Sequence, residues 1–101
     1  MNEKLLTRET ILSELGQLKP GLAKRYGVSR LGLFGSFARG EAREDSDIDV
    51  VIEMNDPDLF ALVHIKEELE QDLRHPVDVI PLSPLMNSFL KARISIEAVY
   101  V

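Results

Sequence analysis

The chain has 101 residues, of which 45% are apolar and 29% charged, with no cysteine and a formal net charge of −5 at pH 7. This length and composition predict one globular domain with a modest core, and the lack of cysteine excludes disulfides and zinc–thiolate sites. The acidic balance argues against a domain that coats nucleic acid, and the sequence shows neither a signal-peptide core nor a long apolar run. We therefore expect a cytoplasmic protein that binds neither nucleic acid nor a membrane directly.

The first 30 residues predict helices. Apolar residues recur at helical spacing from Thr10 to Leu22, and Thr7 is suited to cap this segment. Pro20 predicts a break, followed by a second short helix that ends at Gly27.

Three later segments predict strands. Residues 31–34 are apolar and bracketed by glycine. In residues 47–53, apolar side chains alternate with other residues and β-branched side chains are frequent. Residues 75–82 are predicted to form a third strand that prolines end. Helical spacing predicts helices over about 57–74 and 85–97. This order of elements predicts a small mixed β-sheet flanked by helices, an α/β (α+β) fold.

The stretch GSFARGEAREDSDIDVVIE, residues 35–53, carries the candidate functional residues. Gly35 and Gly40 have the spacing of a phosphate-binding P-loop, but Glu41 and Ala42 follow where that motif requires Lys and Ser or Thr. This excludes a P-loop.

A calcium-binding loop is excluded in the same stretch. Asp45, Asp47 and Asp49 stand at positions 1, 3 and 5 of an EF-hand. That loop also requires Gly at position 6 and Glu at position 12, where this chain has Val50 and Asp56.

Asp47 and Asp49 are instead predicted to bind a metal ion at the start of a strand. Side chains at i and i+2 point to one face, so both carboxylates can reach the same point while Ile48 and Val50 pack beneath them. The two carboxylates repel each other unless a cation lies between them. Magnesium suits the pair because it takes oxygen ligands from carboxylates and substrate phosphates.

Gly35 and Ser36 are predicted to supply the phosphate-binding side of the same site. A strand that ends there and turns into a helical segment offers backbone N–H groups and a hydroxyl to a polyphosphate. Gly35 permits close backbone approach, and Arg39 adds a cation one turn later.

A third carboxylate, Asp78, lies in the third predicted strand. If that strand neighbours residues 47–53, Asp78 comes beside Asp47 and Asp49. Polymerase-type nucleotidyl transfer requires such a set, because one metal ion binds the triphosphate and another lowers the pKa of the attacking hydroxyl. In-line attack on the α-phosphorus would then expel pyrophosphate.

The motifs G-S-x-A-R-G from Gly35 and S-D-x-D from Ser46, with Asp78 in a later strand, resemble the polymerase-β superfamily of nucleotidyltransferases, specifically its minimal stand-alone group. The likeness covers residues 31–80 by motif and essentially the whole chain by length and element order. It implies one minimal nucleotidyltransferase domain over residues 1–101. It further implies nucleotide binding by Gly35, Ser36 and Arg39, and Mg²⁺ binding, with two ions, by the three catalytic aspartates Asp47, Asp49 and Asp78.

Minimal nucleotidyltransferases are typically encoded with a helical HEPN-domain partner, and some transfer AMP from ATP to a tyrosine of that toxin. The resemblance therefore implies an antitoxin that modifies a partner HEPN toxin within a hetero-oligomer. One alternative is an antitoxin that neutralises its partner by occlusion without catalysis, which the intact Ser36 and aspartates argue against. The other is transfer to a small hydroxylated molecule such as an aminoglycoside, which would require a second helical domain or subunit.

Several residues also have purely structural interpretations. Arg39 can pair with Glu41 at the surface, and His64 and His75 are interpreted as packing or capping residues because nothing pairs them at metal spacing. The apolar C-terminal segment, residues 94–101, is predicted to close the core, with a partner surface as the alternative.

Overall fold

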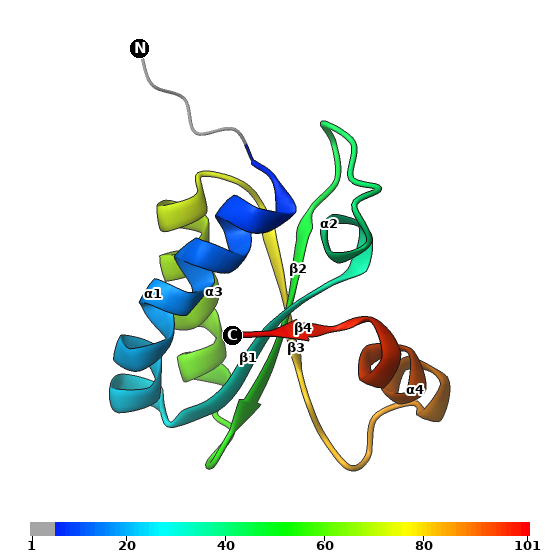
Figure 1. Ribbon diagram of the computed structural model, residues 1–101. Helices are drawn as coiled ribbons and strands as arrows, with labels where there is room; N and C mark the ends of the chain where they lie inside the picture. Colours follow the sequence, from blue (N-terminus) through cyan, green and yellow to red (C-terminus); the bar gives the residue numbers. More distant parts are fainter. Residues whose placement is uncertain (1–5) are drawn as a thin grey trace.

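The computed structural model describes residues 6–101, which form a mixed sheet with helices packed on it (Figure 1). The strands are hydrogen-bonded in the order β3-β2-β1-β4, with β2 antiparallel to β1, parallel to β3, and β4 antiparallel to β1. This confirms the predicted fold class. The elements are α1 (Arg8–Tyr26), β1 (Val28–Phe34), α2 (Gly35–Arg39), β2 (Ile48–Met54), α3 (Leu59–Leu73), β3 (Val77–Pro81), α4 (Ser88–Glu97) and β4 (Val99–Tyr100).

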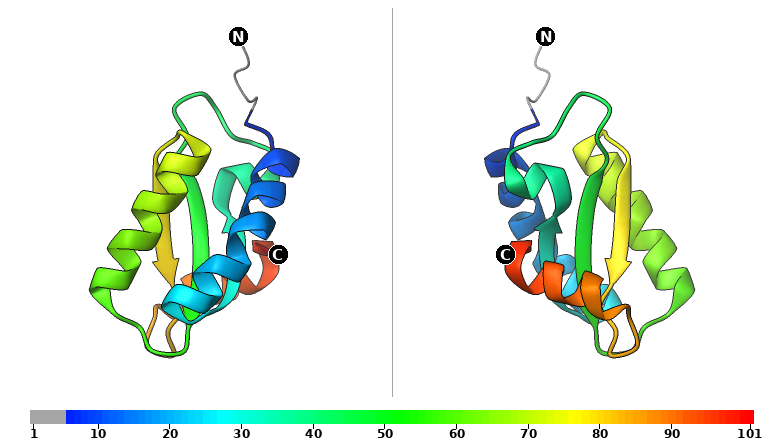
Figure 2. Two further views of the ribbon diagram at one scale, coloured as in Figure 1. Left: turned by 90° about the vertical axis from the view of Figure 1, so that its left-hand side faces the viewer. Right: turned by 90° about the vertical axis from the view of Figure 1, so that its right-hand side faces the viewer.

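The helices divide between the two faces of the sheet (Figures 1 and 2). α1 and α3 cover one face, and α4 lies across the other. Successive residues of β2 point to opposite faces, so Ile48, Val50 and Ile52 join the core under α1 and α3, whereas Val51 packs with Phe34 and Ile94 under α4. Asp49 therefore points to the α4 side of the sheet.

α1 is one helix, and the predicted break at Pro20 is wrong. The helix begins with a capping box in which Thr7 and Thr10 bond each other's backbone N–H groups, and it ends at Gly27 with φ 71° as predicted. Leu15 and Leu22, on either side of Pro20, are both fully buried. Packing of both halves on the same sheet face outweighs the hydrogen bond that proline removes.

The other helices lie close to their predicted ranges. Asp58 caps α3, with Oδ1 accepting from the Phe60 N–H at 3.2 Å. α4 begins at Ser88 rather than at 85, because the Asn87 side chain accepts from the backbone N–H groups of Phe89 and Leu90.

The C-terminal segment was expected to close the core, and it does so in part. Ile94 is buried, and Val99 and Tyr100 form β4, which pairs with Leu33 and Gly32 of β1. Ile96, by contrast, is 83% exposed. Across residues 6–101, none of the helices has the length and apolar character needed to cross a membrane.

Candidate active site

The predicted site residues meet at one end of the sheet, where β1 ends and β2 and β3 begin. Asp49 lies at the centre, because its Cα neighbours are Phe34 on β1 and Asp78 on β3. The predicted third strand therefore lies beside β2, with two carboxylates in facing register. Asp49 is half-buried, whereas Asp47 and Asp78 are exposed.

The negative charges of the three aspartates repel one another. The pKa of Asp49 is raised above its usual value, first by burial and then by the charges of Asp78 and Asp47, while Arg39 opposes the shift. The folded chain therefore holds a carboxylate whose ionised form is disfavoured. A bound cation would offset both the cost of desolvating this carboxylate and its repulsion by Asp78 and Asp47.

Gly35 brings the β1–α2 turn against this group. Its φ is 76°, a left-handed conformation, and a Cβ at this position would collide with the Asp49 carboxylate. Any other residue would therefore displace the turn or Asp49. Because α2 has only five residues, the turn offers the Ser36 hydroxyl and backbone N–H groups rather than a strong helix dipole.

The loop before Asp47 is held by His75 and a small turn. Nε2 of His75 donates to the Ser46 carbonyl oxygen at 2.6 Å, and the His75 ring meets Phe37 edge-on. The backbone N–H of Arg43 donates to Ser46 Oγ at 2.9 Å. These contacts fix the chain just ahead of Asp47, and they confirm that His75 is a packing residue.

Arg39, the last residue of α2, makes two ion pairs, one with the following loop and one with α4. Its Nε bonds Glu41 at 2.8 Å and its Nη1 bonds Glu97 at 2.9 Å. The pairing with Glu41 is the one that the sequence predicts. Glu97 is 58 residues away, and no local pattern could have identified it as a partner. Phosphate binding by Arg39 stays a prediction.

The donor set fits a magnesium ion that is shared with a substrate. Across the described range, 6–101, no three Asp, Glu or His side chains converge closely enough to hold an ion by themselves. Magnesium commonly takes one or two protein carboxylates and completes its shell with water and phosphate oxygens. Asp49 and Asp78 facing each other, with Asp47 nearby and the Gly35–Ser36 turn alongside, suit that mode of binding.

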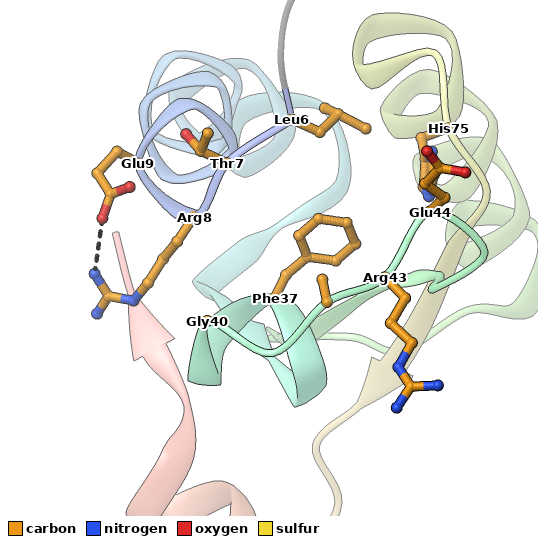
Figure 3. A pocket seen from close by; sticks show the side chains of 10 residues that line it. Leu6, Thr7, Arg8, Glu9, Phe37, Gly40, Arg43, Glu44 and His75 are labelled. Carbon is orange, nitrogen blue, oxygen red and sulfur yellow. Dashed lines mark ion pairs between the residues drawn. The ribbon is translucent and has the colours of Figure 1, made fainter.

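A pocket of about 630 Å³ lies elsewhere, between the start of α1 and the loop from α2 to β2 (Figure 3). None of the six predicted site residues lines it. Its walls include Leu6, Phe37 and His75, and the Arg43 side chain points away from the other labelled residues. The two carboxylates of the pocket, Glu9 and Glu44, lie on opposite sides of it (Figure 3), so we place the candidate site at the open group around Asp49.

A glycine–serine turn beside facing carboxylates, on a mixed sheet of this order, defines a nucleotidyltransferase of the polymerase-β type. Residues 15–101 match the model of the nucleotidyltransferase domain family. The protein adenylyltransferase MntA of Thermococcus cleftensis is 40% identical over 98 residues, which span 96% of this chain and 98% of MntA. A candidate protein adenylyltransferase of Methanocaldococcus jannaschii is 44% identical over 78 residues, covering 76% and 83% of the two chains.

Solved structures agree with this assignment. A candidate minimal nucleotidyltransferase superposes with a TM-score of 0.76 at 32% identity, over 96% of this chain and 98% of its own. A toxin–antitoxin complex with AMP-PNP gives 0.68 at 22% identity, over 83% and 69% of the chains. A tri-AMPylated Shewanella oneidensis HEPN toxin in complex with its MNT antitoxin gives 0.68 at 18%, over 93% and 71%. The last two share the fold. The chain belongs to the nucleotidyltransferase family, in the minimal group that includes MntA.

Proposed function

We propose that this chain is a Mg²⁺-dependent adenylyltransferase that moves AMP from ATP to a tyrosine hydroxyl of a partner HEPN toxin, and thereby acts as the antitoxin. The observation that carries the proposal is the position of Asp49 between the Gly35 turn and Asp78. The names of the relatives support adenylyl transfer to protein. The structural neighbours include a complex with AMP-PNP and an AMPylated HEPN toxin.

The triphosphate of ATP is expected on the β1 side of Asp49. There the Gly35 backbone approaches the carboxylates closely, and Ser36 offers its hydroxyl and N–H to the β- and γ-phosphates. Arg39, one turn on, can exchange a carboxylate partner for a phosphate oxygen. Asp47, Asp49 and Asp78 would hold Mg²⁺, which supplies charge neutralisation and a lowered pKa of the attacking hydroxyl when bound.

The acceptor hydroxyl is expected on the β3 side. Because the strand order is β1-β2-β3 at this point, Asp78 lies across Asp49 from the phosphate-binding turn. The hydroxyl oxygen bonds to the α-phosphorus, the bond from that phosphorus to the oxygen bridging to the β-phosphate breaks, and pyrophosphate leaves. Asp78, the exposed carboxylate on this side, would accept the hydroxyl proton.

The openness of the site favours a protein acceptor over a small molecule. Asp47 and Asp78 are exposed, and the pocket large enough for a small molecule lies away from them. On the same face of the sheet, α4 presents Phe89 and Ile96, which are 81% and 83% exposed. A protein can dock on such a surface and insert one side chain among the carboxylates.

The proposal is tested by incubating the purified chain and its gene neighbour's product with labelled ATP and Mg²⁺. We expect the neighbour to gain one or more AMP units in intact mass. The variant Asp47→Asn with Asp49→Asn should lose this transfer by at least about 10³-fold, since it removes charges that stabilise the transition state. Neutralisation of the toxin by the variant, with no mass gain in either case, would instead establish occlusion. Labelling of an aminoglycoside without the partner would contradict a protein acceptor.

A further inference from the structure

Asp78 lies on β3, which in the described part of the chain pairs with one neighbouring strand. β3 is at the edge of the sheet and spans only Val77–Pro81. On one side it pairs with β2, and the Ile48 N–H donates to the Pro76 carbonyl oxygen at 3.0 Å. Within residues 6–101, no strand lies on its other side to hold its register.

On that open side, a glutamate of α3 accepts a backbone hydrogen bond from β3 next to Asp78. Helix α3 lies against β3 (Figure 2), and Oε2 of Glu70 accepts the Val77 N–H at 2.9 Å. This hydrogen bond captures a backbone donor that would otherwise face solvent at the sheet edge. It is made at the residue directly before Asp78, so it constrains the backbone from which that carboxylate projects.

The carboxylate that makes this bond is itself fixed. The same oxygen of Glu70 accepts from Lys66 Nζ at 2.8 Å, one helical turn earlier. The Lys66–Glu70 hydrogen bond and the Val77 N–H lower the pKa of Glu70, so the acceptor stays ionised. The Lys66 ammonium also interacts with the charges of Asp78 and Asp47. A cation of α3, Lys66, thus acts on the aspartates in addition to Arg39 of α2.

We propose that Glu70 is a positioning residue for nucleotidyl transfer, which holds Asp78 in register with Asp49 through the backbone of Val77. The inference rests on the proposed function, since it concerns the carboxylate placed on the acceptor side. Removing a group that orients a catalytic ligand commonly lowers activity by about 10- to 100-fold. The loss falls on kcat, because Glu70 is remote from the Gly35–Ser36 turn that would bind ATP.

Two conservative substitutions of Glu70 distinguish its positioning of the Val77 backbone from a general effect on structure or charge. Glu70→Gln removes the charge but keeps an oxygen that can accept from Val77, whereas Glu70→Asp keeps the charge and withdraws the oxygen by one methylene. We expect Glu70→Asp and Glu70→Ala to lower kcat for transfer by about 10- to 100-fold with an unchanged KM for ATP. Glu70→Gln should retain most of the activity. Glu67→Ala, at an exposed glutamate of the same helix, is the matched control and should behave as wild type.

A readout independent of activity is hydrogen exchange of the Val77 amide, followed by NMR. We expect protection in wild type and Glu70→Gln, and faster exchange in Glu70→Asp and Glu70→Ala. An active wild type with equal kcat in Glu70→Asp, Glu70→Gln and Glu67→Ala would overturn the inference. An inactive wild type would contradict the proposed function, while unchanged Val77 protection in Glu70→Asp would still overturn the role of Glu70. If Glu70→Ala does not fold, the contrast between Asp and Gln decides.

Discussion

The sheet face under α1 and α3 holds most of the buried apolar residues of the described chain, whereas the face under α4 buries Phe34, Val51 and Ile94. The same strands build both faces. On β2, Ile52 points to the large core, and Asp49 and Val51 point to the α4 side. One face therefore supplies the stability of the fold, and this allows the other to carry a group of repelling carboxylates.

α4 is attached to the rest of the molecule more lightly than α1 or α3. Ile94 is its one buried residue within the described chain, and Phe89 and Ile96 are exposed. Its contacts with α2 include the ion pair between Arg39 and Glu97, near the proposed phosphate-binding turn. The face that we propose binds nucleotide and partner therefore has less packing, as binding regions commonly do.

The largest expected effect comes from a matched pair of isoleucines on the two faces. Ile65→Ala on α3 should lower the free energy of unfolding by about 4 kcal/mol, because the large core around it cannot collapse into the cavity. Ile94→Ala on α4 should lower it by about 2 kcal/mol, since its half-buried neighbours can move and water can enter. Urea unfolding measures both values. An equal or larger loss for Ile94→Ala would mean that the α4 face is as structural as the other.

Two glycines with the same backbone conformation give the next comparison. Gly35 and Gly40 have φ of 76° and 72°, but a Cβ at Gly40 would meet nothing within 4 Å. Gly40→Ala should therefore lower stability by about 1 kcal/mol from backbone strain alone and keep transfer activity. Gly35→Ala should lower stability by about 2–3 kcal/mol and abolish transfer, because it also displaces Asp49. Thermal unfolding and the AMP-transfer assay together measure the difference. Equal behaviour of the two variants would remove Gly35 from the site.

The smallest expected effect concerns the link between α2 and α4. Glu97→Gln weakens a partner of Arg39, so its guanidinium should become more available to phosphate. We expect KM for ATP to fall by no more than about fivefold, the scale of one exposed ion pair, with little change in Tm. Glu67→Gln serves as the control. A rise in KM for Glu97→Gln would show that Glu97 orients Arg39 toward the nucleotide instead of competing with it.

Features set by local pattern could be predicted from the sequence. The alternation of residues 48–53 identified β2, and its period placed Asp47 and Asp49 on one face. The glycine–serine turn and the third strand followed from equally local signals. The predicted roles of Asp47, Asp49 and Asp78 came from their residue types and spacing, and the register of β2 with β3 brings Asp49 and Asp78 together.

Features that depend on contacts between residues distant in the sequence could not be predicted. β4 has two residues and exists only because it pairs with β1, and Gly32 within β1 was its one local sign. A Cβ there would lie 2.8 Å from the Tyr100 ring, and glycine inside a strand often marks such an approach. The continuity of α1 through Pro20 depends on packing at both ends of the helix. Glu70 and Glu97 gave no signal, because their partners lie in other elements.

Thermal unfolding of Asp49→Asn tests most directly whether the ionised Asp49 carboxylate lowers the stability of the fold and whether a bound cation restores it. Because the folded state raises the pKa of Asp49, the cost is absent below the ordinary carboxyl range and appears in full above the raised pKa. In EDTA at pH 7, Asp49→Asn should therefore raise Tm by about 2–5 °C, a modest gain because water screens a half-exposed carboxylate. The gain should shrink as the pH is lowered. Asp45→Asn, at an exposed turn residue, removes the same charge and should leave Tm unchanged.

Addition of Mg²⁺ and AMP-PNP should make the wild type more stable than Asp49→Asn, because we expect only the wild type to bind the ion tightly enough for binding to add stability. Wild type more stable than Asp49→Asn in both conditions would contradict the account, since Asp49 would then be a structural residue.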